Sequence, residues 1–293
     1  MLICEILQQS TAVLATAGVD TPALDAELLL GHCLGMSRTE LTLNAKDVVP
    51  DTLFLQFQTF LNRRTEREPL AYILGVQEFW SLDFVVTPDV LIPRPETEQL
   101  LEKVIAFYSD EQVGDGLLVD LCCGSGAIAV VLAKELQRKV IAIDISFEAL
   151  LVAKTNCEKH GVSHLVSLLQ ANLLSALPFI SNIACVVSNP PYVSRQEMAS
   201  YMQPEVLNYE PHLALDGGQN GLELIERIQK QLLSRLIPNG HLFMEIGTEQ
   251  AQALCNLFTR KETPKQSFSD VSVQKDYAGH DRIFHAKMNS QTL

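Results

Sequence analysis

From residue 96 onward, short apolar segments alternate with longer segments of helical periodicity, and this alternation strongly limits the folds open to the chain. Strands that are separated by helices form βαβ units, whose right-handed connections place the strands parallel in one sheet. The pattern therefore predicts an α/β fold with a Rossmann-like, mostly parallel sheet of seven strands. The expected strands are LLVDL (117–121), VIAID (ending at Asp144), LVSLL (165–169), ACVVS (184–188), HLFMEI (241–246), FSDVSV (268–273) and RIFHA (282–286).

The first 75 residues have a different pattern, in which apolar side chains recur at helical spacing. Thr21 is expected to cap one helix, and Ser37 with Glu40 has the spacing of a capping box. Residues 76–86, VQEFWSLDFVV, alternate as a β-hairpin does, and a proline-rich stretch follows. We therefore expect a helical domain at 1–75, a hairpin and linker at 76–95, and an α/β domain at 96–293, whose first helix is capped by Thr97.

Charge and cysteine content restrict the partners and the compartment. The 293 residues carry a formal net charge of −13, which disfavours direct binding to the phosphates of nucleic acid. The seven cysteines are odd in number and include no CxxC pair, so they indicate reduced thiols in a cytoplasmic protein. The N-terminus lacks a signal-peptide pattern, and no apolar run could span a bilayer. No metal-ligand spacing occurs, and we expect a monomer.

A glycine turn follows the first predicted strand in VDLCCGSGAIAV. Gly124 and Gly126 allow the backbone to approach a ligand that a Cβ atom would exclude, and the following helix offers free N–H groups. Asp144 ends the next strand, where its carboxylate can accept hydrogen bonds from ribose hydroxyls. The pattern G-x-G-x-x-A fits a dinucleotide, and the same architecture fits S-adenosylmethionine, with Asp120 facing its amino-acid end. The alternative is a tight turn that binds nothing.

The sequence SNPPYV ends the fourth predicted strand, beside the first one. Pro190 and Pro191 have no N–H, so this stretch presents carbonyl oxygens, and the Asn189 side chain adds another acceptor. Tyr192 offers the face of an aromatic ring. A planar NH₂ group, with two donor hydrogens and two apolar faces, matches this set. An ordinary loop is the alternative, because Asn-Pro and Pro-Pro commonly mark turns.

These motifs resemble those of a known enzyme family. SNPPYV is similar to the [N/D]-P-P-[Y/F] motif of methyltransferases that modify planar nitrogen in adenine or glutamine. The segments REPLAYILGVQEFWSLDFVVTPDVLIPRPETE, EPHLALDGGQNGLELI and KDYAGHDRI resemble the PrmC/HemK family of peptide chain release factor N5-glutamine methyltransferases. The resemblance extends over nearly the whole chain, from DAELLLGHCLG to AGHDRIFHA.

The resemblance implies a class I methyltransferase domain that uses S-adenosylmethionine and methylates the glutamine in the Gly-Gly-Gln loop of class 1 release factors. It implies that Asn189, Pro190, Pro191 and Tyr192 hold the glutamine amide. The implied cofactor residues are Asp120, Cys122, Cys123, Gly124, Ser125, Gly126, Asp144, Asn172, Leu173 and Asn189. Two positions depart from the family pattern: Cys122 replaces the first glycine of D-x-G-x-G-x-G, and Asn172-Leu173 replaces an acid and an aromatic residue.

Several readings remain open from the sequence. The chain could be an adenine-N6 methyltransferase acting on nucleic acid, or could methylate a ribosomal-protein glutamine instead. It could also be an NAD-dependent oxidoreductase, or a helical adaptor whose α/β domain senses the cofactor. Arg94, Glu96 and Glu98 in IPRPETE are candidates for cleft contacts, whereas Glu245 and Gly247 are expected to be structural.

Overall fold

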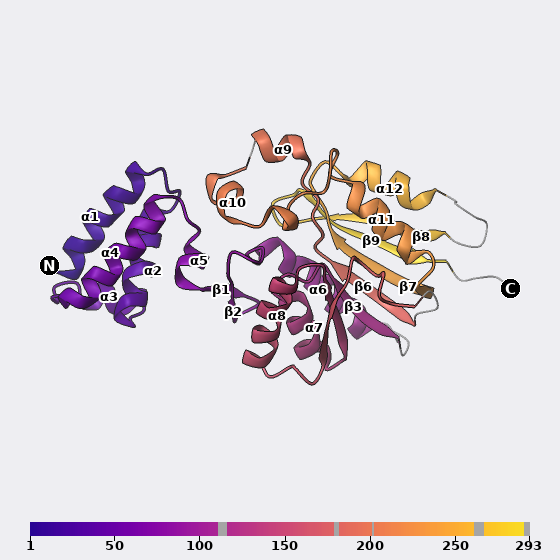
Figure 1. The fold of residues 1–293 in the computed structure, drawn as a ribbon, viewed down its shortest axis with the longest axis horizontal. Coiled ribbons are helices and arrows are strands. Elements are labelled where there is room, and N and C mark those ends of the chain that lie inside the picture. Colours follow the sequence, from indigo (N-terminus) through magenta and orange to yellow (C-terminus); the bar gives the residue numbers. More distant parts are fainter. Residues whose placement is uncertain (111–115, 179–181, 201, 261–266, 290–293) are drawn as a thin grey trace. The chain divides into compact units, whose positions relative to one another are not determined.

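The computed structural model describes residues 1–110, 116–178, 182–200, 202–260 and 267–289 (Figure 1). The chain divides into two compact units. One comprises Met1–Val76 and Gln203–Tyr209, and the other comprises Gln77–Met202 and Glu210–Leu293. Within the described residues, none of the helices combines the length and the apolar character needed to cross a membrane.

The first unit is helical. Its helices are α1 (Ile3–Thr16), α2 (Pro22–Leu34), α3 (Arg38–Leu43), α4 (Asp51–Thr65), α5 (Leu70–Leu74) and α10 (Pro204–Tyr209). Their apolar faces meet in a core that includes Ile6, Leu30 and Phe57. The predicted capping box is confirmed, because the Ser37 hydroxyl accepts the Glu40 N–H while the Glu40 carboxylate accepts the Ser37 N–H. Thr21 stands at the predicted N-cap, but its hydroxyl donates to Asp25 Oδ1 instead of capping the backbone.

Helix α10 belongs to the helical unit although it is distant from the other helices in sequence. The Glu205 carboxylate accepts hydrogen bonds from the Arg67 guanidinium at 2.6 Å and from Arg64 at 3.1 Å. Arg64 is itself buried and donates to Asp25 Oδ2 at 2.7 Å. The Tyr209 hydroxyl donates to the Glu66 carbonyl. Chain position alone gives no sign of this insertion, and the predicted domain boundaries stay predictions.

The hairpin predicted at 76–86 is confirmed as β1 (Val76–Phe79) and β2 (Leu82–Val85). The next helix, α6 (Pro95–Asp110), begins earlier than predicted. Proline is well suited to the first helical position, because its fixed φ is already helical and no N–H is lost there. Thr97 therefore lies inside the first turn, and the prediction that it caps this helix is wrong.

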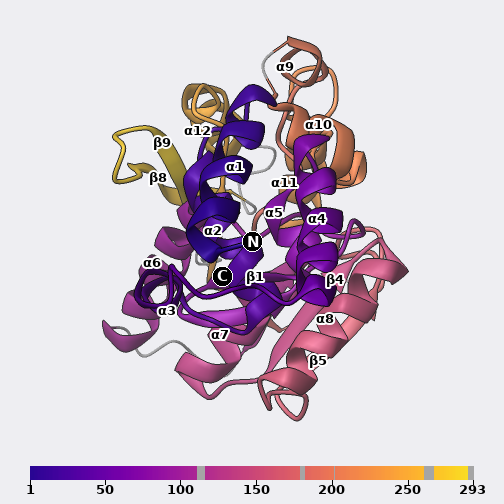
Figure 2. The same ribbon diagram turned by 90° about the vertical axis from the view of Figure 1, so that its left-hand side faces the viewer.

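The second unit contains the predicted seven-stranded sheet. Its order is β5-β4-β3-β6-β7-β9-β8, in which β9 runs antiparallel to both of its neighbours. All seven strand predictions are confirmed, and Figure 2 shows β5 and β8 at opposite edges. The strands are β3 (Leu117–Leu121), β4 (Val140–Asp144), β5 (Val166–Gln170), β6 (Ile183–Ser188), β7 (Leu236–Glu245), β8 (Phe268–Lys275) and β9 (Asp281–Met288).

Helices cover both faces of this sheet (Figure 1). On one face, α6, α7 (Ala127–Leu136) and α8 (Phe147–Lys159) pack over residues such as Leu118, Ala142 and Val187. On the other face, α11 (Glu223–Leu232) and α12 (Ala251–Thr259) pack over the alternate residues, such as Val119 and Val186. Short helices α9 (Arg195–Ser200) and η1 (His212–Ala214) follow β6. From β3 the chain continues to β4 and β5 on one side of β3, and it then crosses over to form β6 on the other side of β3. The carboxyl ends of β3 and β6 therefore form a topological switch point, where ligands bind in open α/β sheets.

The position of α10 generates a stability prediction. Glu205→Gln removes the negative charge and leaves Arg64 and Arg67 with weaker acceptors, so we expect a local destabilisation of about 2 kcal/mol. Hydrogen exchange of the α10 amides should then be about 30-fold faster at neutral pH. The control is Glu27→Gln, which breaks the more exposed pair with Arg38 and should change exchange little. Equal exchange rates in α10 of wild type and Glu205→Gln would show that the bonds from Arg64 and Arg67 to Glu205 do not hold this helix in place.

Candidate active site

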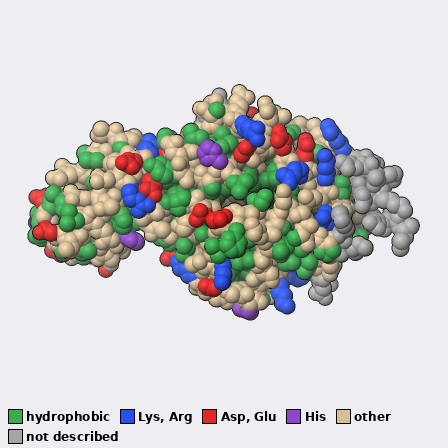
Figure 3. Space-filling view, in the orientation of Figure 1, with side chains coloured by type: hydrophobic (Ala, Val, Ile, Leu, Met, Phe, Trp, Pro, Cys, Tyr) green, Lys and Arg blue, Asp and Glu red, His purple; other side chains and the backbone are tan. Residues whose placement is uncertain are grey.

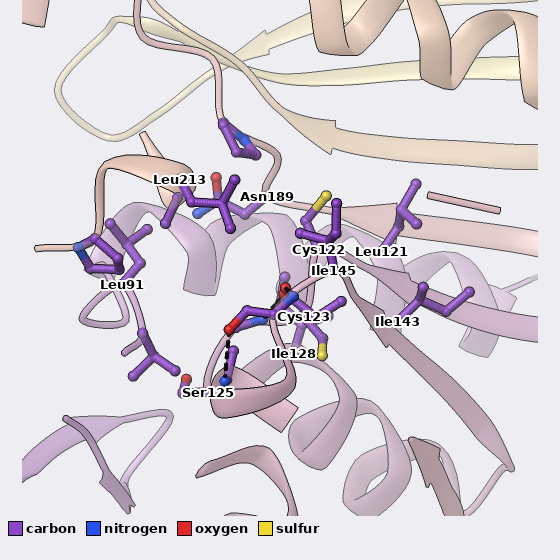
Figure 4. A pocket seen from close by; sticks show the side chains of 18 of the residues that line it. Leu91, Leu121, Cys122, Cys123, Ser125, Ile128, Ile143, Ile145, Asn189 and Leu213 are labelled. Carbon is purple, nitrogen blue, oxygen red and sulfur yellow. Dashed lines mark hydrogen bonds between the residues drawn. The ribbon is translucent and has the colours of Figure 1, made fainter. Parts of the chain in front are cut away.

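A cavity of about 310 Å³ lies at the carboxyl ends of the central strands, within the second unit (Figure 4). Its volume is in the range of small-molecule sites. Nine of the residues that the sequence singled out line it: Cys122, Cys123, Gly124, Ser125, Asp144, Asn172, Leu173, Asn189 and Pro191. Four others, Asp120, Gly126, Pro190 and Tyr192, are outside this lining.

The glycine turn between β3 and α7 uses its two glycines for different reasons. Gly124 has φ of +51°, and a Cβ atom built on it meets no protein atom within 4 Å. Gly126 has φ of +77°, and its Cβ would lie 3.0 Å from the Cβ of Ala153 in α8. Gly126 is therefore required for helix packing, whereas the space beside Gly124 is left open for a ligand.

Cys122 adopts a left-handed backbone conformation with φ of +62°. This conformation costs a non-glycine residue about 1–2 kcal/mol and explains why a glycine is usual at this position in the family that the motif resembles. Burial raises the pKa of both the Cys122 and the Cys123 thiol. Both side chains are therefore neutral walls of the cavity at physiological pH and are unsuited to nucleophilic attack.

Asp144 ends β4 and ties the glycine turn to the sheet. Its Oδ2 accepts the Gly124 N–H and its Oδ1 accepts the Ser146 N–H, both at 2.9 Å. Each carboxylate oxygen can accept a second hydrogen bond, so Asp144 retains capacity for the hydroxyls of a ligand. Burial raises the pKa of Asp144 above its usual range, against the effect of these backbone donors.

Asp120 lies beneath the turn and does not reach the cavity. The side chain is fully buried, its Oδ2 accepts the Ala129 N–H at 2.9 Å, and its Oδ1 has no partner among the described residues. Burial raises the pKa of Asp120 to about 8, and the charge of Asp144 adds to this rise. Asp120 therefore supports the first turn of α7, and its place near a cofactor's amino-acid end stays a prediction.

The segment NPPY is held by the chain that follows α10. Val193 N–H donates to the Leu215 carbonyl, and Gly217 N–H donates to the Val193 carbonyl. A Cβ atom on Gly217 would lie 2.9 Å from the Pro191 carbonyl oxygen, so only glycine permits this close approach. The Gln250 side chain also donates to the Tyr192 carbonyl at 2.8 Å. The segment LDGG (215–218) thus supports the NPPY backbone.

The side chains of NPPY make a further set of bonds. Asn189 Nδ2 donates to Thr97 Oγ1 at 3.1 Å, and among the described residues no donor contacts Asn189 Oδ1. Tyr192 Oη donates to Glu245 Oε1 at 2.9 Å. Burial and the neighbouring Glu245 carboxylate raise the pKa of Tyr192, so its phenol stays neutral. The Asn189 oxygen is therefore a free acceptor at the cavity.

The proline-rich segment lines the cavity with residues other than those the sequence favoured. Val90, Leu91, Pro93 and Thr97 form part of the wall, whereas Arg94, Glu96 and Glu98 do not. Arg94 instead pairs with the buried carboxylate of Glu210. Glu98 accepts the Trp80 N–H at 2.7 Å. Arg94 and Glu98 therefore help to fix the path of this segment. The place of Thr97 in the wall was missed because the sequence pattern predicted a helix cap there.

Helix α11 contributes a basic side chain that sequence reasoning missed. Arg227 lines the cavity, and its Nη2 donates to Asn172 Oδ1 at 2.6 Å. Arg227 belongs to the exposed face of a strongly amphipathic helix, where a charged residue carries no functional signal. Asn172 therefore has its amide nitrogen left for a ligand, and its neighbour Leu173 has φ of +55°. Arg227 thus contacts the side chain at which the chain departs from the family pattern.

Comparisons with known proteins agree with this architecture. Residues 5–75 match the family model described as the PrmC N-terminal domain, and residues 99–220 match the methyltransferase small domain. The release factor glutamine methyltransferase of Geobacter sulfurreducens is 38% identical over 283 residues, or 96% of this chain and 95% of that protein. The enzyme of the same name from Nitratidesulfovibrio vulgaris is 36% identical over 285 residues, or 97% and 94%.

A solved structure shows the same fold at low identity. The hMettl16 catalytic domain in complex with MAT2A 3'UTR hairpin 1 has a TM-score of 0.56 and 17% identity, and the match covers 85% of each chain. At this identity the likeness concerns the fold alone.

The open space at Gly124 generates a binding prediction. Gly124→Ala should cost about 1–2 kcal/mol of stability through backbone strain, because its Cβ meets no protein atom. The same Cβ intrudes on the space for a ligand, so we expect the Kd for S-adenosylmethionine, measured by calorimetry, to rise about 10–100-fold. Gly161→Ala is the matched control, since Gly161 also has positive φ and an open Cβ position but lies outside the cavity lining. A similar Kd in both variants would contradict the hypothesis that the ligand occupies the space beside Gly124.

Asp144 generates a pH prediction. An ionised carboxylate accepts hydroxyl hydrogens more strongly than a protonated carboxyl group, and the pKa of Asp144 is raised, so affinity should fall as the pH falls through that raised pKa. Asp144→Asn should weaken binding about 10–100-fold at neutral pH and remove the acidic decline. Calorimetry across a pH series measures both effects, with exposed Asp83→Asn as control. An acidic decline that persists in Asp144→Asn would assign it to another group.

Proposed function

The chain belongs to the release factor glutamine methyltransferase family, and from this premise we propose that it methylates the glutamine of the Gly-Gly-Gln motif in class 1 peptide chain release factors. The methyl group goes from S-adenosylmethionine to the side-chain amide nitrogen, N5. The observation that carries the proposal is the Asn189 amide, which turns its NH₂ to Thr97 and keeps its oxygen as an acceptor beside the cavity.

The residues of the cavity fit S-adenosylmethionine. Gly124 leaves room for close approach of the ligand, and Asp144 has lone pairs left for ribose hydroxyls. Apolar side chains, among them Ile145, Leu173 and Leu224, offer walls for a flat base. When bound, this cofactor supplies a methyl group on a positively charged sulfur. We assign Cys122, Cys123 and Ser125 to the wall beside its methionine portion.

The protein's task is to orient an unreactive amide. The nitrogen lone pair of glutamine is delocalised into the carbonyl, and no side chain is assigned to remove the N–H proton before attack. The proton would leave to water once the nitrogen carries the methyl group. As the nitrogen forms its new bond it becomes positive, and its hydrogens become stronger donors. Acceptors at Asn189 Oδ1 and the Pro190 carbonyl then stabilise the transition state more than the ground state.

Pro191, which lines the cavity, and Tyr192, which follows it outside the lining, complete the proposed amide site. The Tyr192 ring limits the tilt of the glutamine amide and favours developing positive charge. Its hydroxyl is already engaged with Glu245 and its pKa is raised, so Tyr192 acts through its ring and not as a base. Orientation of this kind supplies much of the rate gain when two reactants are held in line.

The alternative substrate, adenine in nucleic acid, uses the same amide chemistry but has less support. The formal net charge is −13, and on the face in Figure 3 Lys and Arg form small separate groups interspersed with acids. A binder of polyanions usually presents a continuous basic stripe. We infer that the helical unit takes part in docking the protein substrate. The monomeric state and the cytoplasmic location stay predictions.

Intact-mass analysis tests the proposal. A class 1 release factor incubated with the protein and S-adenosylmethionine should gain one methyl group, which fragmentation should map to the Gly-Gly-Gln glutamine. DNA and RNA oligonucleotides incubated in parallel should gain none. A methyl group on the nucleic acid, or none on the release factor, would overturn the assignment.

Asn189→Ala tests the role of the amide. Loss of a charge-stabilising hydrogen bond should lower kcat about 100-fold, while the Kd for S-adenosylmethionine should change by less than about threefold. Asn256→Ala removes an amide from the exposed face of α12 and is the control. Turnover of Asn189→Ala that equals the control would exclude the assigned role.

A further inference from the structure

Three segments that are far apart in sequence meet behind the amide site. Thr97 comes from the first turn of α6, Glu245 ends β7, and Asn189 and Tyr192 follow β6. Thr97 Oγ1 donates to Glu245 Oε2 at 2.6 Å and accepts from Asn189 Nδ2 at 3.1 Å. Tyr192 Oη donates to the other oxygen of Glu245 at 2.9 Å. Thr97 and Glu245 are 4% and 1% exposed, so water does not compete for these bonds.

The direction of these hydrogen bonds is fixed by the number of hydrogens. A threonine hydroxyl has one hydrogen, and here Thr97 donates it in a hydrogen bond to the Glu245 carboxylate. Thr97 can therefore only accept from Asn189, and the one Asn189 group able to donate is its NH₂. An amide with its nitrogen held in this way keeps its oxygen available to accept from a ligand.

We propose that Thr97 and Glu245 are positioning residues that hold the Asn189 amide with its oxygen toward the substrate and anchor Tyr192 from the same carboxylate. This inference rests on the proposed function and deepens it. The two residues contact no reacting atom; they act through Asn189 and Tyr192. Their arrangement also selects the substrate, because a glutamine NH₂ donates to the Asn189 oxygen whereas a glutamate carboxylate would be repelled by it.

Loss of the Thr97 hydroxyl makes the opposite orientation of Asn189 available. If the amide rotates by half a turn, its NH₂ meets the NH₂ of glutamine, and two donors face each other without an acceptor. The same rotated amide would offer a donor to a carboxylate. A purely structural role for Thr97 would lower stability without changing the preference between glutamine and glutamate.

The test compares Thr97→Val, which keeps the shape and removes the hydroxyl, with Thr97→Ser, which restores it. With a release factor as substrate, we expect kcat of Thr97→Val to fall about 10–100-fold and Thr97→Ser to retain most of the wild-type value. The Kd for S-adenosylmethionine should stay within about threefold in both variants, as should all parameters of Thr155→Val. Thr155 is the control because its hydroxyl bonds to the Leu151 carbonyl on the exposed face of α8.

A specificity measurement separates positioning from stability. A release factor whose Gly-Gly-Gln glutamine is replaced by glutamate serves as competitive inhibitor. Relative to the KM for the unaltered factor, its inhibition constant should fall about tenfold or more in Thr97→Val. Glu245→Gln provides a second route, since its amide can donate to Thr97 and thereby turn the threonine hydrogen toward Asn189; it should show the same loss of kcat.

The outcomes are distinguishable. Equal kcat in wild type and Thr97→Val, an equal loss in Thr97→Ser, or an unchanged preference for glutamine over glutamate would each overturn the positioning role. Absence of methylation by the wild-type protein itself would overturn the proposed function, whatever the variants do.

Discussion

The parallel pairing of β3 with β6 is the constraint on which the site depends. Its register sets Leu121 beside Ser188, so the next residues, Cys122 and Asn189, leave the sheet together. The Ser188 hydroxyl donates to the Leu121 carbonyl at 2.6 Å and fastens the two strand ends to each other. A shift by one residue would move every side chain to the opposite face and would separate the glycine turn from NPPY. The sheet thus converts two short motifs, 63 residues apart between Gly126 and Asn189, into one site.

Two consecutive prolines create a difficulty that the rest of the chain resolves. Without N–H groups, Pro190 and Pro191 cannot be fixed by donating into a ladder, so their position must be set by contacts and by bonds to their neighbours. Gly217 supplies the close contact, and Gln250 holds the Tyr192 carbonyl. The same prolines leave acceptors unopposed by donors, which suits a site for an NH₂ group. The two prolines therefore both restrict the backbone of this loop and provide the acceptors that an NH₂ group needs.

Sequence periodicity was sufficient for the sheet, because buried strands and amphipathic helices leave strong local patterns. The prediction for Thr97 failed, because a threonine fits the local rule for helix caps, whereas the helix begins two residues earlier at Pro95. Periodicity gave no sign that Glu245, expected to be structural, would bond to both Thr97 and Tyr192. Arg227 and α10 were missed for a related reason: their roles are defined by partners distant in the chain, and an exposed or short helical segment shows no trace of such partners.

Backbone strain at the cavity gives the departures from the family pattern a physical context. Cys122 and Leu173 both line the cavity and both have positive φ, a conformation that non-glycine residues avoid. Such residues persist where their surroundings determine the backbone, and here β3 and β4 are joined by Cys123 N–H to the Ile143 carbonyl at 3.0 Å. The sheet therefore bears the cost of the turn, and Cys122 lines the cavity at a position where glycine is usual in the family pattern. Strain in two residues that line the cavity is an arrangement expected where a rigid core holds a shaped site.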